Sequence, residues 1–425
     1  MCSQWSRKVA ALKLPEDVTL RAVVSHYVSP GDFNGLFVGR GVLPVDIDTA
    51  AEHVVGGLLQ VVSENDYPNP HIRPWKSRRS IDDQVTDLRD AATGVSYGVC
   101  LYPKPQIMAE VLEAGDYVDL PYERRLAEGQ GWLDVAYFRF EVLESYRNDP
   151  RYHFDFLDFG VTTGVTDAVY LAENERDADK VSLSHIGYAY DFSRADDGVI
   201  ARSVCAFLSD LAKLTPEHQW RWRSYEVTPP ESVHPHPVWF GQMMGNWADG
   251  IGPFEKLMVE LKAWNTLHMR AFDCDLLRET ERPREFGWII RSSQSEFDQF
   301  VQTLDKLLSD NISHEALDAA NAPRKNEAGD SLGTLNRIAQ LLESKGNPKE
   351  SVDELLLPLR EVRSARMEPA HRLRRNVTDE NIVGQQVELL VRVIDSVQDL
   401  RQFWQRHPAN ADWADTDVEE KHYRL

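Results

Sequence analysis

An arginine and a histidine five residues apart, Arg366 and His371, are the residues of this chain whose types and spacing best fit a chemical reaction. A guanidinium group can neutralise a phosphate, and an imidazole with a pKa near neutrality can move a proton beside it. Pro369 lies between the two, and a proline inside a helix usually ends or bends that helix. The sequence therefore predicts a helix that breaks at Pro369 and presents His371 next to Arg366.

The segment around this pair is basic in an otherwise acidic chain. Residues 359–376 hold six arginines and two glutamates, whereas the whole chain of 425 residues has a net charge of −21. Such a balance argues against a surface that coats nucleic acid and favours a short, specific contact with RNA. We expect Arg363 to help hold a phosphate and three further arginines to follow the RNA backbone: Arg372, Arg374 and Arg375.

The spacing alone does not identify a site, because an arginine followed by a histidine after four to six residues recurs along the chain. The four matching pairs are Arg21–His26, Arg147–His153, Arg366–His371 and Arg401–His407. Only the third combines a helical setting, a helix-breaking proline and local positive charge. The alternative for its arginines is a structural one, in which they form surface ion pairs with Glu361 and Glu368.

The elements that would position the pair are helices with regularly spaced apolar residues. This pattern predicts four helices between residues 295 and 407, and short connections between them indicate a helical bundle. Their expected cores are Phe297–Leu308, Leu332–Leu342, Val352–Arg366 and Ile382–Trp404.

Residues 295–407, with the motif Arg363-x-x-Arg366-x-x-Pro369-Ala370-His371, resemble a HEPN domain (higher eukaryotes and prokaryotes nucleotide-binding). The arrangement also resembles a group of bacterial proteins that join a mixed N-terminal region to a HEPN-like C-terminus. In the ribonuclease members of the superfamily, an Arg-x4–6-His motif lies within a bundle and two copies meet at a dimer interface. One position departs from the active pattern: the residue after the motif arginine is often polar, and here it is Met367.

The resemblance implies a metal-independent RNA endonuclease that needs no cofactor and leaves 2′,3′-cyclic phosphate ends. Arg366 would neutralise the scissile phosphate, and His371 would act as the general base or acid. The partners implied are RNA, a second copy of the chain bound through the C-terminal helical domain, and a regulatory protein. By analogy the protein would be a regulated toxin or an anti-phage defence effector. The alternative is a non-catalytic HEPN-like protein that binds or dimerises as a sensor or scaffold.

The rest of the chain is expected to be mixed in structure, so the fold class is α+β. We predict a mixed α/β domain of unknown role over 1–195, a helical and loop-rich connection over 196–290, the bundle over 295–407 and an acidic tail over 408–425. Within these regions the patterns predict a strand at Val18–Val28, helices at Asp48–Ser63, Val199–Leu214 and Pro253–Phe272, and several short strands between Asp155 and Phe192.

Other residue groups point less clearly to chemistry. His234 and His236 have the spacing of two metal ligands, but they lie in a proline-rich loop with no third carboxylate at metal spacing. His153, Asp155 and Asp158 could form a metal cluster, but a strand with turn residues explains them better, so we expect no metal site. Trp220 and Trp222, each followed by an arginine, could stack on bases or build an interface.

Four widely spaced cysteines indicate neither a disulfide framework nor a zinc site. No apolar run reaches the length of a membrane span and the N-terminus has no signal-peptide core, so we expect a cytoplasmic protein without a membrane partner.

Overall fold

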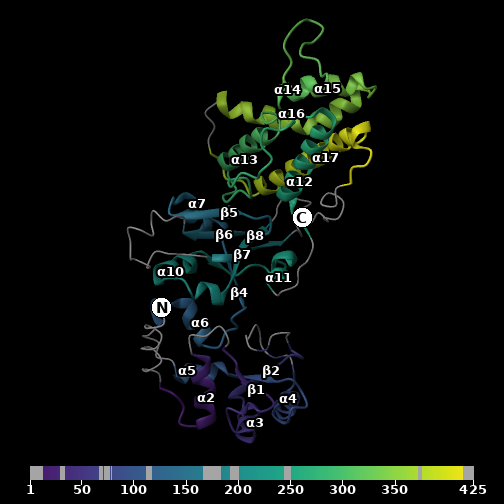
Figure 1. The fold of residues 1–425 in the computed structure, drawn as a ribbon. Helices are drawn as coiled ribbons and strands as arrows, with labels where there is room; N and C mark the ends of the chain where they lie inside the picture. Colours follow the sequence, from purple (N-terminus) through teal and green to yellow (C-terminus); the bar gives the residue numbers. More distant parts are fainter. Residues whose placement is uncertain are drawn as a thin grey trace. The chain divides into compact units, whose positions relative to one another are not determined.

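The computed structural model describes residues 13–28, 34–66, 70, 77, 79–111, 117–165, 183–191, 201–243, 250–371 and 376–414 (Figure 1). The chain forms two compact units. Unit 1 comprises residues 1–138, 168–185 and 205–228, and unit 2 comprises residues 139–167, 186–204 and 229–425. Among the described residues, the chain passes between the units at 138–139, at 228–229 and within strands β7 (Leu183–Asp191) and β8 (Ala201–Phe207).

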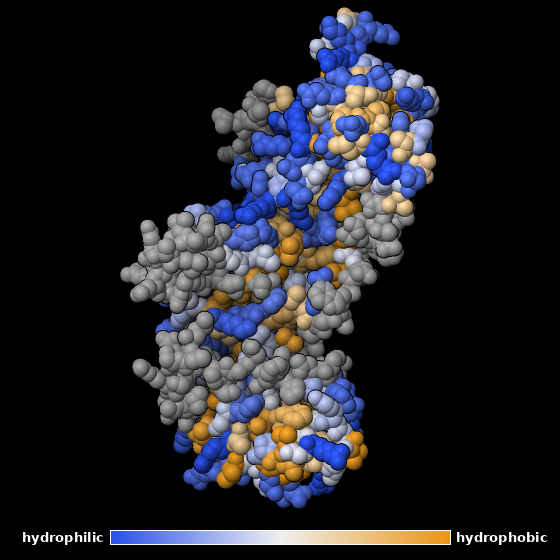
Figure 2. Space-filling model, viewed as in Figure 1, coloured by the Kyte–Doolittle hydropathy of each residue, from blue (hydrophilic) through white to orange (hydrophobic). Residues whose placement is uncertain are grey.

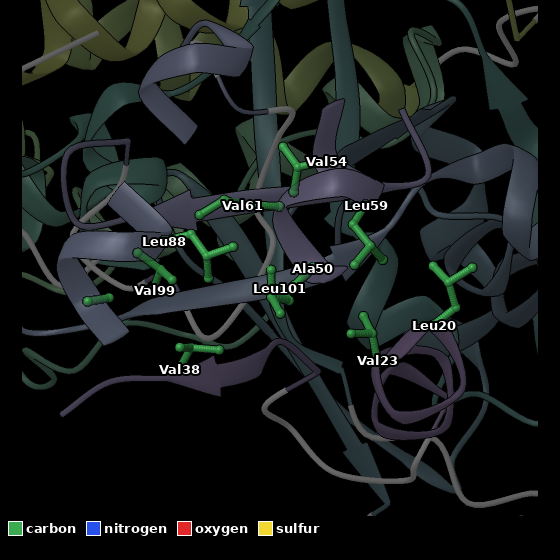
Figure 3. Close-up of a cluster of buried hydrophobic side chains, with 12 residues drawn as sticks. Leu20, Val23, Val38, Ala50, Val54, Leu59, Val61, Leu88, Val99 and Leu101 are labelled. Atoms are coloured by element: carbon green, nitrogen blue, oxygen red, sulfur yellow. The ribbon is translucent and has the colours of Figure 1, made fainter. Parts of the chain in front are cut away.

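The first part of unit 1 is an antiparallel sheet of three strands packed against helices. The strands β1 (Leu36–Val38), β2 (Leu59–Ser63) and β3 (Val99–Pro103) lie in the order β1-β3-β2. The helices are α2 (Val18–Tyr27), α3 (Ile47–Val55), α4 (Ile81–Thr93) and α5 (Pro105–Val111). Figure 3 shows the core between the sheet and the helices, where aliphatic side chains such as Leu20, Val54, Leu88 and Leu101 meet.

Two predictions for this region were wrong. Val18–Val28 is mainly helix α2 and not a strand, because Leu20, Val23, Val24 and Tyr27 are buried at helical spacing and Asp17 caps the helix by accepting a hydrogen bond from the backbone N–H of Leu20. The helix predicted over 48–63 ends at Val55, and β2 follows it. Gly57 separates the two elements with a φ of 73°, a left-handed conformation that suits glycine and ends a helix.

The second part of unit 1 contains short elements. These are α6 (Pro121–Ala127), β4 (Val135–Phe138), α9 (Leu208–Leu211), α10 (Pro216–Tyr225) and β9 (Glu226–Val227), and β4 pairs antiparallel with β9. The helix predicted over 199–214 was wrong, because residues 201–207 form strand β8 and, of the described residues in this range, only the four of α9 are helical. The run from Val204 to Leu208 is buried at every position, which fits a strand covered on both faces.

Unit 2 begins with strands and short helices. Its elements up to residue 243 are η2 (Phe140–Leu143), α7 (Glu144–Asn148), β5 (Tyr152–Phe156), β6 (Gly160–Val165), β10 (His234–Pro235) and α11 (Pro237–Met243). The sheet continues from β5 through β6 and β7 to β8, and β10 pairs with β7. Strands were predicted between Asp155 and Phe192, and β5, β6 and β7 confirm them.

The rest of unit 2 is helical. The helices are α12 (Pro253–Phe272), α13 (Gln294–Leu307), α14 (His314–Ala319), α15 (Thr334–Ser344), α16 (Lys349–His371) and α17 (Ile382–Gln405), followed by η5 (Pro408–Asn410). Helix α12 packs along α17, and α16 lies against α13, α15 and α17 (Figure 1). Helix α12 has the predicted bounds, and each of the four helix cores predicted after residue 295 falls on a helix.

Asp158, in the turn between β5 and β6, fixes the start of α12. Its carboxylate accepts a hydrogen bond from the backbone N–H of Glu255 at 2.9 Å and pairs with Arg282 at 2.5 Å. The strands of unit 2 and its long helices are thus joined by a buried charged contact. Mixed strands followed by C-terminal helices agree with the α+β class.

Candidate functional site

The motif arginine Arg366 is bound to two carboxylates near the end of helix α13. Its Nη1 donates a hydrogen bond to Oδ2 of Asp305 at 2.5 Å and also pairs with Asp310. Hydrogen bonds to these two carboxylates raise the pKa of Arg366 above its ordinary value, and the bond to Asp305 has the larger effect. The positive charge of the guanidinium is therefore already compensated by carboxylates, as a bound phosphate would compensate it.

Asp305 is a fully buried carboxylate, with an exposed fraction of 0%. It also accepts a hydrogen bond from the hydroxyl of Ser309. A buried carboxylate needs a cation or several donors to offset its lost hydration. Arg366, which reaches it from α16, provides that charge, and so Arg366 joins α16 to α13.

Arg363, one turn before Arg366, contacts the same end of α13. Its Nη1 donates to Oγ of Ser309 at 2.9 Å and lies 3.6 Å from Oδ1 of Asp310. The last carbonyl groups of a helix carry partial negative charge, which also attracts cations to this end of α13. Both described arginines that were predicted to bind phosphate are engaged within the bundle.

Helix α16 does not break at Pro369, and this prediction was wrong. The helix continues to His371 and also contains Pro358. A proline removes one backbone hydrogen bond and its ring crowds the preceding turn, a cost of about 3 kcal/mol that tertiary packing can outweigh. Here Leu356, Leu359 and Val362 of α16 are buried in the bundle.

An unbroken helix separates the two motif positions. Five residues at 3.6 per turn place position 371 about 140° around the axis from position 366. Arg366 lies on the side of the buried residues Leu359 and Val362, whereas position 371 falls on the side of Leu357 and Ser364, which are exposed. The side chain of His371 and the residues Arg372, Arg374 and Arg375 lie outside what the structure describes.

The sequence reasoning missed the partners of Arg366. The expected structural alternative paired the arginines with Glu361 and Glu368, yet Glu361 pairs with Arg392 of α17 at 2.6 Å. Asp305 and Asp310 lie about sixty positions earlier in the chain. No local spacing signals a contact over that distance; only the packing of α16 on α13 creates it.

The histidine groups that could resemble metal sites are engaged otherwise. His236 is buried, its ring stacks on Phe159 at 3.9 Å, and His234 is exposed. His153 pairs with Asp155, while Asp158 is occupied by α12 and Arg282. Across the described residues, no group of three or more His, Cys, Asp or Glu side chains could hold a metal ion.

The two tryptophans of α10 have different environments. Trp222 is fully buried and meets the ring of Phe138 edge-on at 4.7 Å, whereas Trp220 is about half exposed. Trp222 is thus part of the core of unit 1, which leaves at most one of the two for stacking on a base.

None of the helices in the described part of the chain has the length and apolar character needed to cross a membrane. Comparisons of the whole chain with protein-family models, with curated proteins and with solved structures found no match.

Proposed function

We propose that the C-terminal helices form a HEPN-like domain that acts by docking, with a second copy of the chain as its partner, and not as a self-contained ribonuclease. The observation that carries this proposal is the commitment of Arg366 to Asp305 and Asp310. An arginine that joins two helices of its own bundle performs a structural task, and a phosphate could bind it only in competition with two carboxylates.

The outer face of α16 supports docking. Leu357 and Met367 are apolar side chains with exposed fractions of 47% and 52%. They lie on one side of the helix, together with Ser364 and position 371. Ser364 is seven residues after Leu357, Met367 is three after Ser364 and position 371 is four after Met367, and residues at these spacings lie near one another around a helix. We call the face formed by Leu357, Ser364 and Met367 the outer stripe of α16.

The helices of unit 2 also carry a largely hydrophilic surface. In the view of Figure 2, hydrophilic residues predominate over α13, the helix against which α16 packs. Apolar side chains amid polar ones are the usual anatomy of a contact between proteins. Met367, which departs from the pattern of active HEPN ribonucleases, thereby acquires a role as a contact residue.

Light scattering coupled to size-exclusion chromatography tests the proposal on the full chain. We expect a dimer at micromolar concentration, and we expect the double variant Leu357→Glu/Met367→Glu to be a monomer. Val95→Glu is the matched control, since Val95 is an exposed apolar residue of unit 1. A monomeric wild type, or a double variant that dimerises as well as the control, would contradict the proposal.

RNA cleavage by Arg366 and His371, with an anti-phage or toxin role as its consequence, is the second candidate function. The locally positive segment 359–376 favours it. Cleavage requires Arg366 to release Asp305 and Asp310 and to bind a phosphate in their place. It also requires position 371 to reach the substrate from another side of α16. In a dimer, position 371 of one copy could face the partner across the outer stripe.

A further inference from the structure

A partly buried arginine of unit 2, Arg202 in strand β8, has no carboxylate within ion-pair distance among the described residues. Its Nη2 donates to the backbone oxygen of Ile290 at 3.2 Å, and its guanidinium carbon lies 4.0 Å from the ring centroid of Phe140. Its Nη1 is buried and has no hydrogen-bond partner. Burial lowers the pKa of Arg202 to about 10, so the group is still a cation at neutral pH.

Two acidic side chains favour the charged form of this arginine without forming an ion pair with it. Glu296 and Glu141 act on Arg202 only through space. An oxygen of Glu296 accepts a hydrogen bond from the backbone N–H of Ile290 at 2.7 Å and lies 3.4 Å from Arg147. A buried charge without a partner is costly, and folded proteins compensate it with an ion of opposite sign or with several hydrogen bonds.

A second donor beside Arg202 lacks an acceptor as well. Tyr188 of the neighbouring strand β7 has an exposed fraction of 0%, and its hydroxyl group has no hydrogen-bond partner. Its ring stacks on the same Phe140 ring, with centroids 5.1 Å apart. Burial raises the pKa of Tyr188, so the hydroxyl keeps its proton and can donate it in a hydrogen bond.

A third donor comes from the segment that follows α12. Arg282 pairs with Asp158 through Nη1 and donates from Nε to the backbone oxygen of Phe286, but its buried Nη2 has no partner. The charges of Arg202 and Arg282 both act to lower the pKa of Tyr188, whereas the carboxylate of Asp158 acts to raise it. Buried donors from β7, β8 and this segment therefore all lack an acceptor.

We infer that Arg202, Tyr188 and Arg282 bind a small oxyanion, a phosphate or carboxylate group, inside unit 2. An oxyanion supplies the acceptors that these three residues lack and the negative charge that Arg202 lacks, and guanidinium groups match the geometry of both anions. A water molecule could accept hydrogen bonds there but would leave the charge of Arg202 uncompensated. The inference is independent of the function proposed for α16.

Isothermal titration calorimetry on the full chain, with inorganic phosphate and with acetate in separate titrations at constant ionic strength, tests the inference. Native mass spectrometry of the purified protein detects an anion that is already bound. We expect saturable binding of one probe or a bound anion, and the better probe tells phosphate from carboxylate. Arg202→Met should weaken binding at least about tenfold, since hydrogen bonds to charged groups are worth that much.

Two further variants keep the test decisive. Arg284→Gln removes a charge whose side chain is 71% exposed in the same segment, and it should leave binding unchanged. Tyr188→Phe should weaken binding of the probe even if Arg202→Met fails to fold. If no anion is found and neither probe binds, or if Tyr188→Phe binds as tightly as the wild type, the inference is wrong.

Discussion

The buried carboxylate of Asp305 in α13 accepts a hydrogen bond from Arg366 in α16 at 2.5 Å. This contact turns an arginine whose sequence context suggests phosphate binding into a link between two helices. Its removal would leave Asp305 buried with the hydroxyl of Ser309 as its remaining side-chain donor among the described residues.

Replacement of Arg366 by alanine should therefore destabilise the protein. We expect Arg366→Ala to lower the free energy of unfolding by about 1–3 kcal/mol, the usual penalty for a buried polar group that loses its partner. Urea unfolding followed by circular dichroism measures the change. Arg363→Ala is the control and should cost less, since Arg363 is half exposed and its contacts, Ser309 and Asp310, do not leave a buried charge behind. Equal free energies of unfolding for Arg366→Ala and the wild type would show that the contact does not stabilise the protein.

A second buried network, between α12 and α17, should be more sensitive. Glu260 is fully buried and accepts from Arg401 at 2.6 Å while Lys256 lies 2.7 Å away. Glu260→Leu leaves two cations without their carboxylate, and we expect a loss of about 3–5 kcal/mol in the free energy of unfolding. Arg401→Met should cost less, because Lys256 still compensates Glu260.

The matched control for this network is Arg392→Met. Arg392 pairs with Glu361 on the surface, and such pairs contribute less than about 1 kcal/mol. Thermal unfolding of the three variants gives the order of stabilities. An Arg401→Met variant less stable than Glu260→Leu would refute the assignment of Lys256 as a second partner.

His268 should make the stability of the protein depend on pH. It is buried against Trp404, whose indole N–H donates to its Nδ1 at 2.9 Å, and burial lowers its pKa to about 4. The unfolded chain binds the proton first, near pH 6.5, so the stabilisation is present above pH 6.5 and is lost as the pH falls toward 4. Between these two pH values the free energy of unfolding falls by about 1.4 kcal/mol for each pH unit.

Urea unfolding between pH 7.5 and pH 5 measures this slope. His268→Gln keeps a polar side chain without a titrating group, and its stability should fall less steeply over the same range. His185 offers a comparison of opposite sign, since Asp210 raises the pKa of His185 and its contribution is lost as the pH rises. Identical slopes for wild type and His268→Gln would show that His268 does not titrate as described.

The long helices of unit 2 could be predicted from the sequence because their apolar residues recur at helical spacing over many turns. Helix α12 between Pro253 and Phe272 is the clearest case. Short elements were harder. In α2, β-branched residues indicated a strand. The segment is a helix because Asp17 caps its start and its buried residues recur three or four positions apart.

The contacts of the candidate site could not be predicted in the same way. The residue types around Arg366 are visible in the sequence, but its partners depend on how α16 packs against α13. Pro369 illustrates the second difficulty. A local rule predicts a break there, whereas tertiary packing keeps the helix continuous and carries position 371 away from Arg366.

The most direct test of the account is an RNA cleavage assay on the purified full chain with EDTA present. We predict that the wild type leaves total RNA intact and that His371→Ala behaves identically, because Arg366 is held by Asp305 and Asp310. Cleavage by the wild type that is lost in His371→Ala, with 2′,3′-cyclic phosphate ends on the products, would contradict the account and establish the nuclease function instead.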